Sequence, residues 1–224
     1  MNVDKKKAAA ERAVEFVQNG MVVGLGTGST AYFAIEALGR RVAEGLEIAG
    51  VATSSGTEQL AERFGVPLVP LDDVTLIDVT IDGADEVDQN FNLIKGMGGA
   101  LLREKVVAYA SLEEIIIVDD SKVVEVLGTR SPLPVEVAPF GHKLTKSALE
   151  GLGCQARLKG GAKPFMTDNG NLIYECKFER IEDPEFLEIE IHLIPGVIES
   201  GLFIGLATKV VIGQESGTQL REKH

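Results

Sequence analysis

Cysteine is scarce in this chain of 224 residues, and that scarcity excludes a disulfide-stabilised class of protein. The two cysteines, Cys154 and Cys176, are too few for a disulfide framework, and neither belongs to a CxxC pair. We therefore expect both to be small core residues rather than catalytic groups or metal ligands.

Long apolar runs and an excess of basic residues are missing as well. No run reaches the about 18 apolar residues that cross a bilayer, so no membrane partner is expected. The first 17 residues follow a charged, helical pattern without the apolar segment of a signal peptide, which predicts a cytoplasmic protein. With 22 basic and 34 acidic residues, the chain should repel nucleic acid. The lysines at 5–7 are expected only to keep a helix surface solvated.

The first half of the chain alternates between helical and strand patterns. Because βαβ alternation builds parallel sheets, the predicted fold is α/β, with a Rossmann-like, mostly parallel sheet. A short edge segment is expected at 66–71, where two prolines interrupt the pattern. The predicted strands are 21–25, 46–52, 75–81 and 114–118, and the predicted helices are 8–18, 31–38, 57–64 and 100–110.

After residue 127 the pattern changes to β-α-β-β-α-β, which is typical of a smaller, ferredoxin-like α+β domain. An Asn-Gly hairpin turn at 169–170 joins two of its strands. A last strand at 207–212 is expected to return to the first sheet. The predicted domains are therefore 1–127 plus 205–224, and 128–204, the second being a possible oligomer interface. The smaller domain's predicted strands are 135–138, 155–159, 165–167, 171–178 and 197–204, and its helices are 143–152 and 184–193.

Polar residues follow four of the predicted parallel strands, at 26–30, 53–57, 82–85 and 119–122. Ligands of open α/β sheets bind at the carboxyl ends of the strands. Four polar strand ends on one edge of a sheet therefore predict a binding site there.

The glycine loop GLGTGST at 24–30 is expected to accept phosphate at the start of a helix. It lacks the lysine of a P-loop. It fits the GxGxx(G/A) dinucleotide pattern, but that site also needs an acidic residue after the next strand, and residues 53–57 are Thr-Ser-Ser-Gly-Thr. Hydroxyls at two strand ends favour a small polyol phosphate, with a plain tight turn as the alternative.

Residues 81–105 combine carboxylates, lysines and glycines, which suggests acid/base chemistry on a small anionic substrate. Calcium loops beginning at Asp78 or Asp82 lack the required residues at their other positions, and no nearby His or Cys supports a transition metal. No metal is therefore expected. The triplet Arg103-Glu104-Lys105 spans about 200° of a helix, so at least one member must face the sheet or a cavity. Spacing alone leaves open which one.

These motifs resemble those of the type A ribose-5-phosphate isomerases. The match runs in order along nearly the whole chain, and the DGAD and KG…GG…REK combination is highly specific. One departure is Met97, where the family pattern commonly has glycine. The matching stretches are GTGST at 26–30, DGADE at 82–86, KG at 95–96, GG at 98–99, REK at 103–105, DSK at 120–122, LPVEV at 133–137, TDNGN at 167–171 and IPG at 194–196.

The resemblance implies interconversion of D-ribose 5-phosphate and D-ribulose 5-phosphate, in the non-oxidative branch of the pentose phosphate pathway, through an enediol and without a cofactor. Glu104 would be the general base, Asp82 and Asp85 would handle hydroxyl protons, and Lys95 would stabilise the enediolate. A homodimer or homotetramer is also implied. The implied substrate-binding residues are Thr27, Gly28, Ser29, Thr30, Asp82, Gly83, Ala84, Asp85, Lys95, Gly96, Met97, Gly98 and Lys122, of which 27–30 and Lys122 would hold the phosphate.

Two alternatives compete with the isomerase. A related sugar-phosphate enzyme, such as an amino-sugar phosphate deaminase or a sugar lactonase, would need a general base other than Glu104. A sugar-phosphate sensor of a transcription regulator would need a DNA-binding domain, for which there is no room before Gly24, and would have degraded acid/base residues. The carboxylates are intact, so the isomerase is favoured.

Overall fold

The structure is a computed structural model that describes residues 2–223. It forms two compact units, one of Met1–Ala84, Arg103–Val123 and Gly205–His224, the other of Asp85–Leu102 and Val124–Ile204. Compared with the predicted domains, the second unit also takes in 85–102 and 124–127. The domain boundaries given above stay a prediction.

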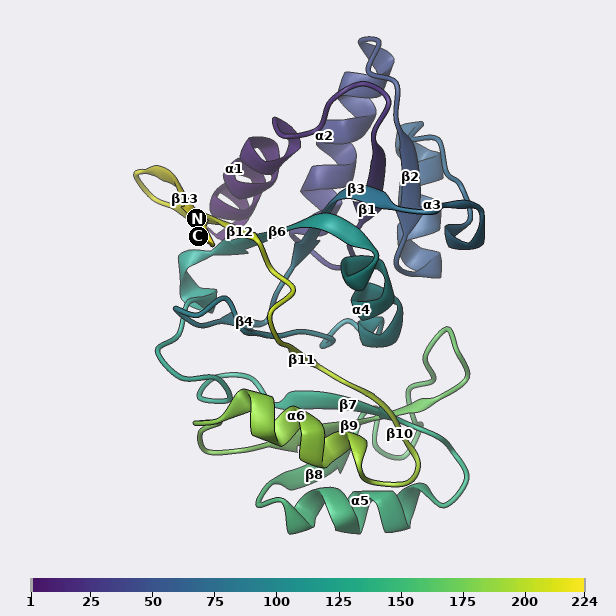
Figure 1. Ribbon diagram of the computed structural model, residues 1–224, viewed down its shortest axis with the longest axis vertical. Coiled ribbons are helices and arrows are strands. Elements are labelled where there is room, and N and C mark those ends of the chain that lie inside the picture. The colour runs from purple at the N-terminus through teal and green to yellow at the C-terminus, as the bar shows by residue number, and fades with distance from the viewer. Residues whose placement is uncertain (1, 224) are drawn as a thin grey trace. The chain divides into compact units, whose positions relative to one another are not determined.

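The first unit is built on a six-stranded sheet with the order β13-β12-β6-β3-β1-β2 (Figure 1). All neighbours are parallel except the β12–β13 hairpin, so the predicted mostly parallel sheet is confirmed. The strand expected at 207–212 is β12 and pairs with β6, whereas β13 was not predicted. The strands are β1 Val22–Leu25, β2 Ala49–Ala52, β3 Ile77–Gly83, β6 Ser111–Asp119, β12 Lys209–Gln214 and β13 Gly217–Glu222.

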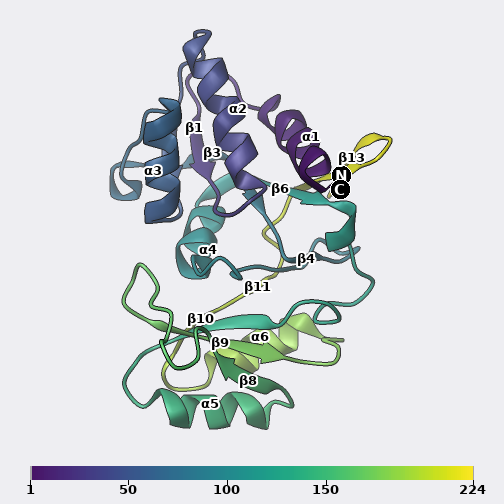
Figure 2. The same cartoon turned by 180° about the vertical axis from the view of Figure 1, so that it is seen from behind.

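Three neighbouring helices cover one face of this sheet, α1 Asn2–Val14, α2 Ala31–Ala43 and α3 Ser55–Phe64 (Figure 2). Their apolar sides pack on Val23, Leu25 and other inward strand residues. A Cβ at Gly24, which alternates with Val23 and Leu25, would instead meet Val107 of α4 Leu101–Tyr109. Because successive strand residues face opposite sides, α4 covers the other face. Helix α1 begins at Asn2 rather than at residue 8, so the lysines at 5–7 belong to it.

Strands β1, β2, β3 and β6 run parallel to one another, so their carboxyl ends share one edge of the sheet. Four polar segments lie at these strand ends: the loop after β1, the start of α3, the end of β3 with Asp82, and the short helix η2 Asp120–Lys122. The predicted gathering of polar strand ends is thereby confirmed for the groups that belong to this unit.

The second unit contains an antiparallel sheet with the order β10-β7-β9-β8 and two helices, which is the predicted β-α-β-β-α-β arrangement. The strand predicted at 165–167 is wrong, because these residues form part of the long turn between β8 and β9. Cys154 and Cys176 are buried and free, as expected. The elements are β7 Leu133–Val137, α5 His142–Gly151, β8 Gln155–Leu158, β9 Leu172–Lys177, α6 Pro184–His192 and β10 Val197–Ser200.

A small three-stranded sheet, β11-β5-β4, completes the second unit. Its strands are β4 Glu86–Val87, β5 Leu93–Ile94 and β11 Leu202–Phe203. In the first unit, the edge segment expected at 66–71 makes a single bridge, from Leu68 to Gly50, before the turn η1 Leu71–Asp73. No helix among the described residues is long and apolar enough to cross a membrane.

Candidate functional site

The carboxylate of Asp82 organises the ends of β1 and β3. Its Oδ1 accepts hydrogen bonds from the backbone N–H groups of Thr27 (3.1 Å) and Gly83 (2.6 Å). A Cβ at Gly26 would lie 2.1 Å from the same oxygen, so only glycine allows this approach. The glycine loop is therefore shaped around Asp82, which is itself buried.

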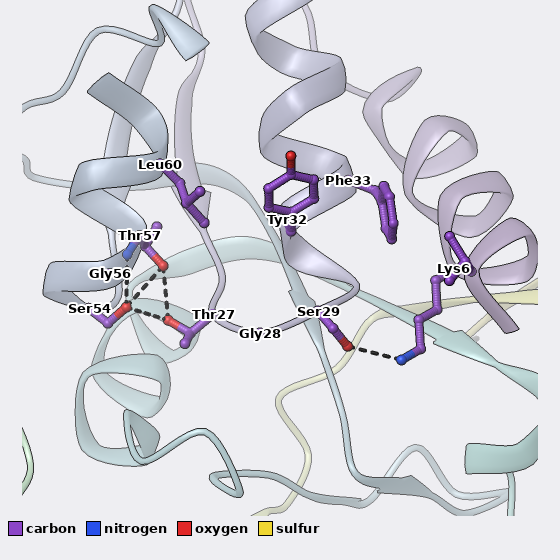
Figure 3. Close-up of a pocket in the computed structure, with 11 residues that line it drawn as sticks. Lys6, Thr27, Gly28, Ser29, Tyr32, Phe33, Ser54, Gly56, Thr57 and Leu60 are labelled. Carbon is purple, nitrogen blue, oxygen red and sulfur yellow. Dashed lines mark hydrogen bonds between the residues drawn. The ribbon is translucent and has the colours of Figure 1, made fainter. Parts of the chain in front are cut away.

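A cluster of hydroxyls links the glycine loop to the residues after β2. The Oγ1 of Thr27 lies 2.9 Å from Ser54 Oγ and 3.0 Å from Thr57 Oγ1 (Figure 3). It also lies 2.8 Å from Thr53 Oγ1. The side chain of Thr27 is thus fully engaged in holding the loop. The end of β2 carries hydroxyls where a dinucleotide site would carry a carboxylate.

The glycine loop borders a cavity of about 550 Å³ in the first unit. Gly28 has a φ of +113°, which an L side chain rarely adopts, and leads into the N-terminus of α2. Helix N-termini present N–H groups and a positive dipole end to anions. Besides Val3, Gly28 and Gly56, the lining consists of the polar residues Lys6, Thr27, Ser29, Ser54 and Thr57 and the apolar or aromatic residues Tyr32, Phe33 and Leu60.

Lys6 lines the cavity, a position that the sequence did not reveal. Its Nζ donates to Ser29 Oγ over 2.9 Å, at the cavity wall (Figure 3). The expectation that the lysines at 5–7 only solvate a helix is therefore wrong for Lys6. It is also wrong for Lys5, whose Nζ pairs with Asp120 at 2.9 Å, whereas Lys7 is half-exposed and 4.0 Å from Glu11. The three lysines make different contacts because α1 packs on the sheet and each lysine lies on a different side of the helix.

Lys122 ends the short helix η2 after β6 and is half-buried. It is not among the described residues that line the cavity. Two lysines, Lys6 on α1 and Lys122 after β6, thus flank the same edge of the sheet, and Lys6 donates a hydrogen bond to Ser29 of the glycine loop.

Glu104 is the inward member of the triplet on α4. Its exposed fraction is 4%, whereas Arg103 and Lys105 are half-buried. This answers the question that helical spacing left open. Burial keeps bulk water from a carboxylate and so suits it to proton transfer with a bound substrate.

In the second unit, residues 95–99 form a second glycine-rich segment, the Lys95 loop, which is held in place by hydrogen bonds. Asp85 Oδ2 accepts the N–H of Met97 (3.0 Å), and the N–H of Lys95 donates to Gly201 O (2.9 Å). The Lys95 side chain is 2% exposed, with Nζ 5.3 Å from the ring centroid of Phe203, a cation–π distance.

The loop itself carries φ angles of +100° at Gly96 and +90° at Gly99. Successive N–H groups in such conformations form concave nests that bind oxyanions. Two predicted substrate-binding residues lie beside Asp82, Gly83 at the end of β3 and Ala84 directly after it. Three more belong to the Lys95 loop, namely Gly96, Met97 and Gly98. Asp82 and Glu104 belong to the first unit, and Asp85 and Lys95 to the second.

Two other buried carboxylates hold loops of the second unit. Glu86 accepts N–H groups from Gly128 and Arg130, both at 2.7 Å, and from Ser131. Glu136 Oε1 accepts from Thr167 Oγ1 (2.9 Å) and Asn171 Nδ2 (2.8 Å). The sequence motifs DGADE, LPVEV and TDNGN therefore contain residues that hold loops in place. DGADE also contains the predicted catalytic residues Asp82 and Asp85.

Among the described residues, Glu188, His192 and Glu199 form the one group of side chains close enough to share a metal ion. Both ring nitrogens of His192 face acceptors at 2.9 Å, Nδ1 the backbone oxygen of Glu188 and Nε2 the Oε1 of Glu199. The hydrogen bond to Glu199 is the main cause that raises the pKa of His192 to about 9. An imidazolium has no lone pair for a metal, so the group is an ion-pair cluster at neutral pH.

Comparison with known proteins identifies the family. The profile of the family described as ribose 5-phosphate isomerase A (phosphoriboisomerase A) matches residues 49–217. The chain belongs to this family. The resemblance carried by the sequence motifs is thereby confirmed, and so is the fold class.

Full-length relatives agree with this assignment. The chain is 49% identical to ribose-5-phosphate isomerase A of Parvibaculum lavamentivorans, covering 98% of each, and 52% identical to that of Gloeobacter violaceus, covering 96% of this chain and 94% of the relative. A solved D-ribose-5-phosphate isomerase in complex with phospho-erythronic acid is 42% identical and covers both chains fully, with a TM-score of 0.97. The enzyme of Methanocaldococcus jannaschii is 41% identical, with a TM-score of 0.93 and coverage of 98% and 99%.

Proposed function

We propose that this chain interconverts D-ribose 5-phosphate and D-ribulose 5-phosphate by proton transfer through an enediolate. The observation that carries the proposal is the buried Glu104 on α4, in a chain that belongs to the ribose-5-phosphate isomerase A family. The phospho-erythronic acid in a related structure supports it, because an aldonic acid carries a carboxylate where an enediolate carries its oxygens.

Each step of the proposed reaction has a residue assigned to it. Glu104 removes the proton from C2 of the open-chain aldose and returns it to C1, so no net proton is lost. Asp82 and Asp85 move hydroxyl protons, including those of ring opening. Lys95 and the N–H groups of its loop stabilise the enediolate, a contribution of about 3 kcal/mol per well-placed donor.

The phosphate contacts are proposed to come from the glycine loop and two lysines. Ser29, Thr30 and the N–H groups of 28–30 lie at the N-terminus of α2, which suits a dianion. Lys6 supplies a positive charge beside Ser29, and Lys122 supplies a second from the end of β6. The hydroxyl of Thr27 already has three partners, so we assign it to holding the glycine loop in place and not to contacting the phosphate.

We further propose a homo-oligomer, a dimer or a tetramer, in the cytoplasm, without nucleic acid partners. Helix α6 exposes Phe186 and Ile189, and its C-cap residue Leu193 is exposed as well, so the three recur at helical spacing on one side. An exposed apolar stripe of this kind is typical of an interaction surface. Light scattering on the wild type and on Ile189→Glu tests this. A monomeric wild type would contradict it.

The proposed reaction is tested by a coupled assay that detects ribulose 5-phosphate formed from ribose 5-phosphate. The same protein is offered an amino-sugar phosphate and a sugar lactone in parallel. Turnover of ribose 5-phosphate alone is expected. An inactive wild type, or preferential deamination or lactone hydrolysis, would overturn the proposal.

A further inference from the structure

Met97 lies in the middle of the Lys95 loop, and the peptide bonds on both sides of it are fixed. Its N–H donates to Asp85 Oδ2 over 3.0 Å, and its carbonyl oxygen accepts from Lys159 Nζ over 2.9 Å. Asp85 and Lys95 are proposed catalytic groups, whereas Lys159 comes from the turn after β8, more than sixty residues away in sequence. The loop is therefore held between a reacting group and a distant lysine.

Lys159 is itself held in one place by two further contacts. Its Nζ forms an ion pair with Glu175 Oε1 on β9 at 3.1 Å and lies 5.7 Å from the ring centroid of Phe165. The exposed fractions of the Lys159 and Glu175 side chains are 20% and 24%, so solvent screens this pair less than a surface pair. A lysine with three partners is more rigid than a solvent-facing one.

The same turn packs directly on the Lys95 loop. A Cβ added at Gly99 would lie 2.5 Å from two ring atoms of Phe165, so the aromatic ring approaches the backbone as closely as glycine allows. The N–H of Phe165 donates to the carbonyl oxygen of Lys159 over 2.9 Å, which closes the turn. The predicted strand at 165–167 is replaced by this packing element.

We propose that Lys159 is a positioning residue for the isomerase reaction, acting through the Met97–Gly98 peptide. This inference rests on the proposed function. In a trans peptide the carbonyl and the next N–H point in opposite directions. An ammonium on the Met97 carbonyl therefore fixes where the Gly98 N–H points. Hydrogen-bonded groups polarise one another, so the ammonium also strengthens that N–H as a donor.

The consequence concerns the charged intermediate more than the substrate. A preorganised N–H stabilises an oxyanion more than a neutral hydroxyl or carbonyl. Loss of Lys159 should therefore lower kcat and weaken binding of a carboxylate analogue, while the KM for ribose 5-phosphate changes little.

The test compares Lys159→Met with Lys163→Met, which removes the same charge from an exposed position in the same turn. For Lys159→Met we expect kcat to fall about 10-fold or more, KM to stay within about 2-fold, and the Kd of phospho-erythronic acid to rise about 10-fold. Lys163→Met should match the wild type, and Lys159→Arg should recover most of the activity because it keeps a charged donor.

Equal kcat values for Lys159→Met and Lys163→Met would overturn the proposal, as would equal losses of affinity for substrate and analogue. If Lys159→Met does not fold, Phe165→Leu decides instead. It keeps an apolar side chain but removes the ring beside Gly99, so it should lower kcat without raising KM, and wild-type kcat would refute the proposal. A wild type without isomerase activity refutes the proposed function itself, whereas analogue binding by the variants still measures the effect of Lys159.

Discussion

The Nζ of Lys6 donates a hydrogen bond to the Oγ of Ser29 over 2.9 Å and so brings a positive charge from α1 to the glycine loop. This contact joins the start of the chain to the N-terminus of α2. It supports the proposed share of Lys6 in binding the substrate phosphate, which the basic cluster at 5–7 did not suggest.

Lys6→Met is expected to raise the KM for ribose 5-phosphate about 10-fold or more and to change kcat little. A hydrogen bond to a charged group contributes about 1.5–3 kcal/mol, and phosphate binding is nearly the same in the ground and transition states. Steady-state kinetics measure the effect. Lys7→Met, which removes a charge from a half-exposed neighbour, is the control. An unchanged KM in Lys6→Met would remove Lys6 from the phosphate site.

Lys122→Ala should also raise KM more than it lowers kcat, for the same reason. The double variant with Lys6→Met then reports whether the two lysines contact one phosphate. Combined losses smaller than the sum of the single losses would indicate coupling through a shared group. If Lys122→Ala leaves KM at the wild-type value, the phosphate contact belongs to the glycine loop and Lys6.

Glu104→Gln is expected to lower kcat by a factor of about 10²–10⁴, because the amide cannot accept the C2 proton. KM should change little, since the side chain keeps its size. The control Glu62→Gln alters an exposed carboxylate of α3 and should leave kinetics unchanged. Near-normal kcat in the Glu104 variant would show that another group is the base.

Gly26→Ala should lower both activity and stability, because its Cβ would lie 2.1 Å from Asp82 Oδ1. Overpacking of a buried site costs about 1–3 kcal/mol, and here the displaced group is a proposed catalytic carboxylate. Gly56→Ala is the matched control, since its Cβ would meet only Ser54 Oγ at 3.7 Å and alanine favours the helix that it occupies. Urea unfolding and the coupled assay compare the two, and equal stabilities would contradict the close approach.

The His192 cluster predicts a loss of stability at high pH. The pKa of His192 is raised from 6.5 to about 9, chiefly by the hydrogen bond to Glu199 and also by Glu188, the two carboxylates that face it. Because the pKa is higher in the folded state, the protonated imidazole stabilises the native state, and this stabilisation is fully present below the unfolded pKa of 6.5. The stabilisation is lost as the pH rises through the folded pKa of about 9. Because the imidazole is 39% exposed, we expect only about 1 kcal/mol.

Urea unfolding between pH 6 and pH 10 measures this contribution in the wild type and in His192→Gln. The difference in free energy of unfolding between the two should be largest near pH 6 and should shrink toward pH 10. A difference that stays constant over this range would show that His192 acts through packing rather than charge.

The local chemistry of this protein was determined by the sequence alone. Glycines at 26 and 28, the carboxylates of 82–86 and the REK triplet follow from residue type and spacing, and the alternation of apolar segments predicted the two larger sheets but not the three-stranded one. Those patterns are properties of neighbouring residues. The failure at 165–167 has a local cause as well, since Pro164 and the glycines at 160–161 shape a turn in which Phe165 packs on Gly99 instead of pairing in a ladder.

Tertiary structure alone decided which contacts each member of a polar cluster makes. Three lysines at 5–7 are equivalent in sequence, yet Lys5 pairs with Asp120, Lys6 reaches Ser29 and Lys7 faces solvent. Likewise only burial distinguishes Glu104 from Arg103 and Lys105. The contact of Lys159 with Met97 joins residues that no local pattern connects. These contacts depend on which face of a helix or turn packs against a distant segment. The free energy of that packing cannot be read from the spacing of residues within the segment.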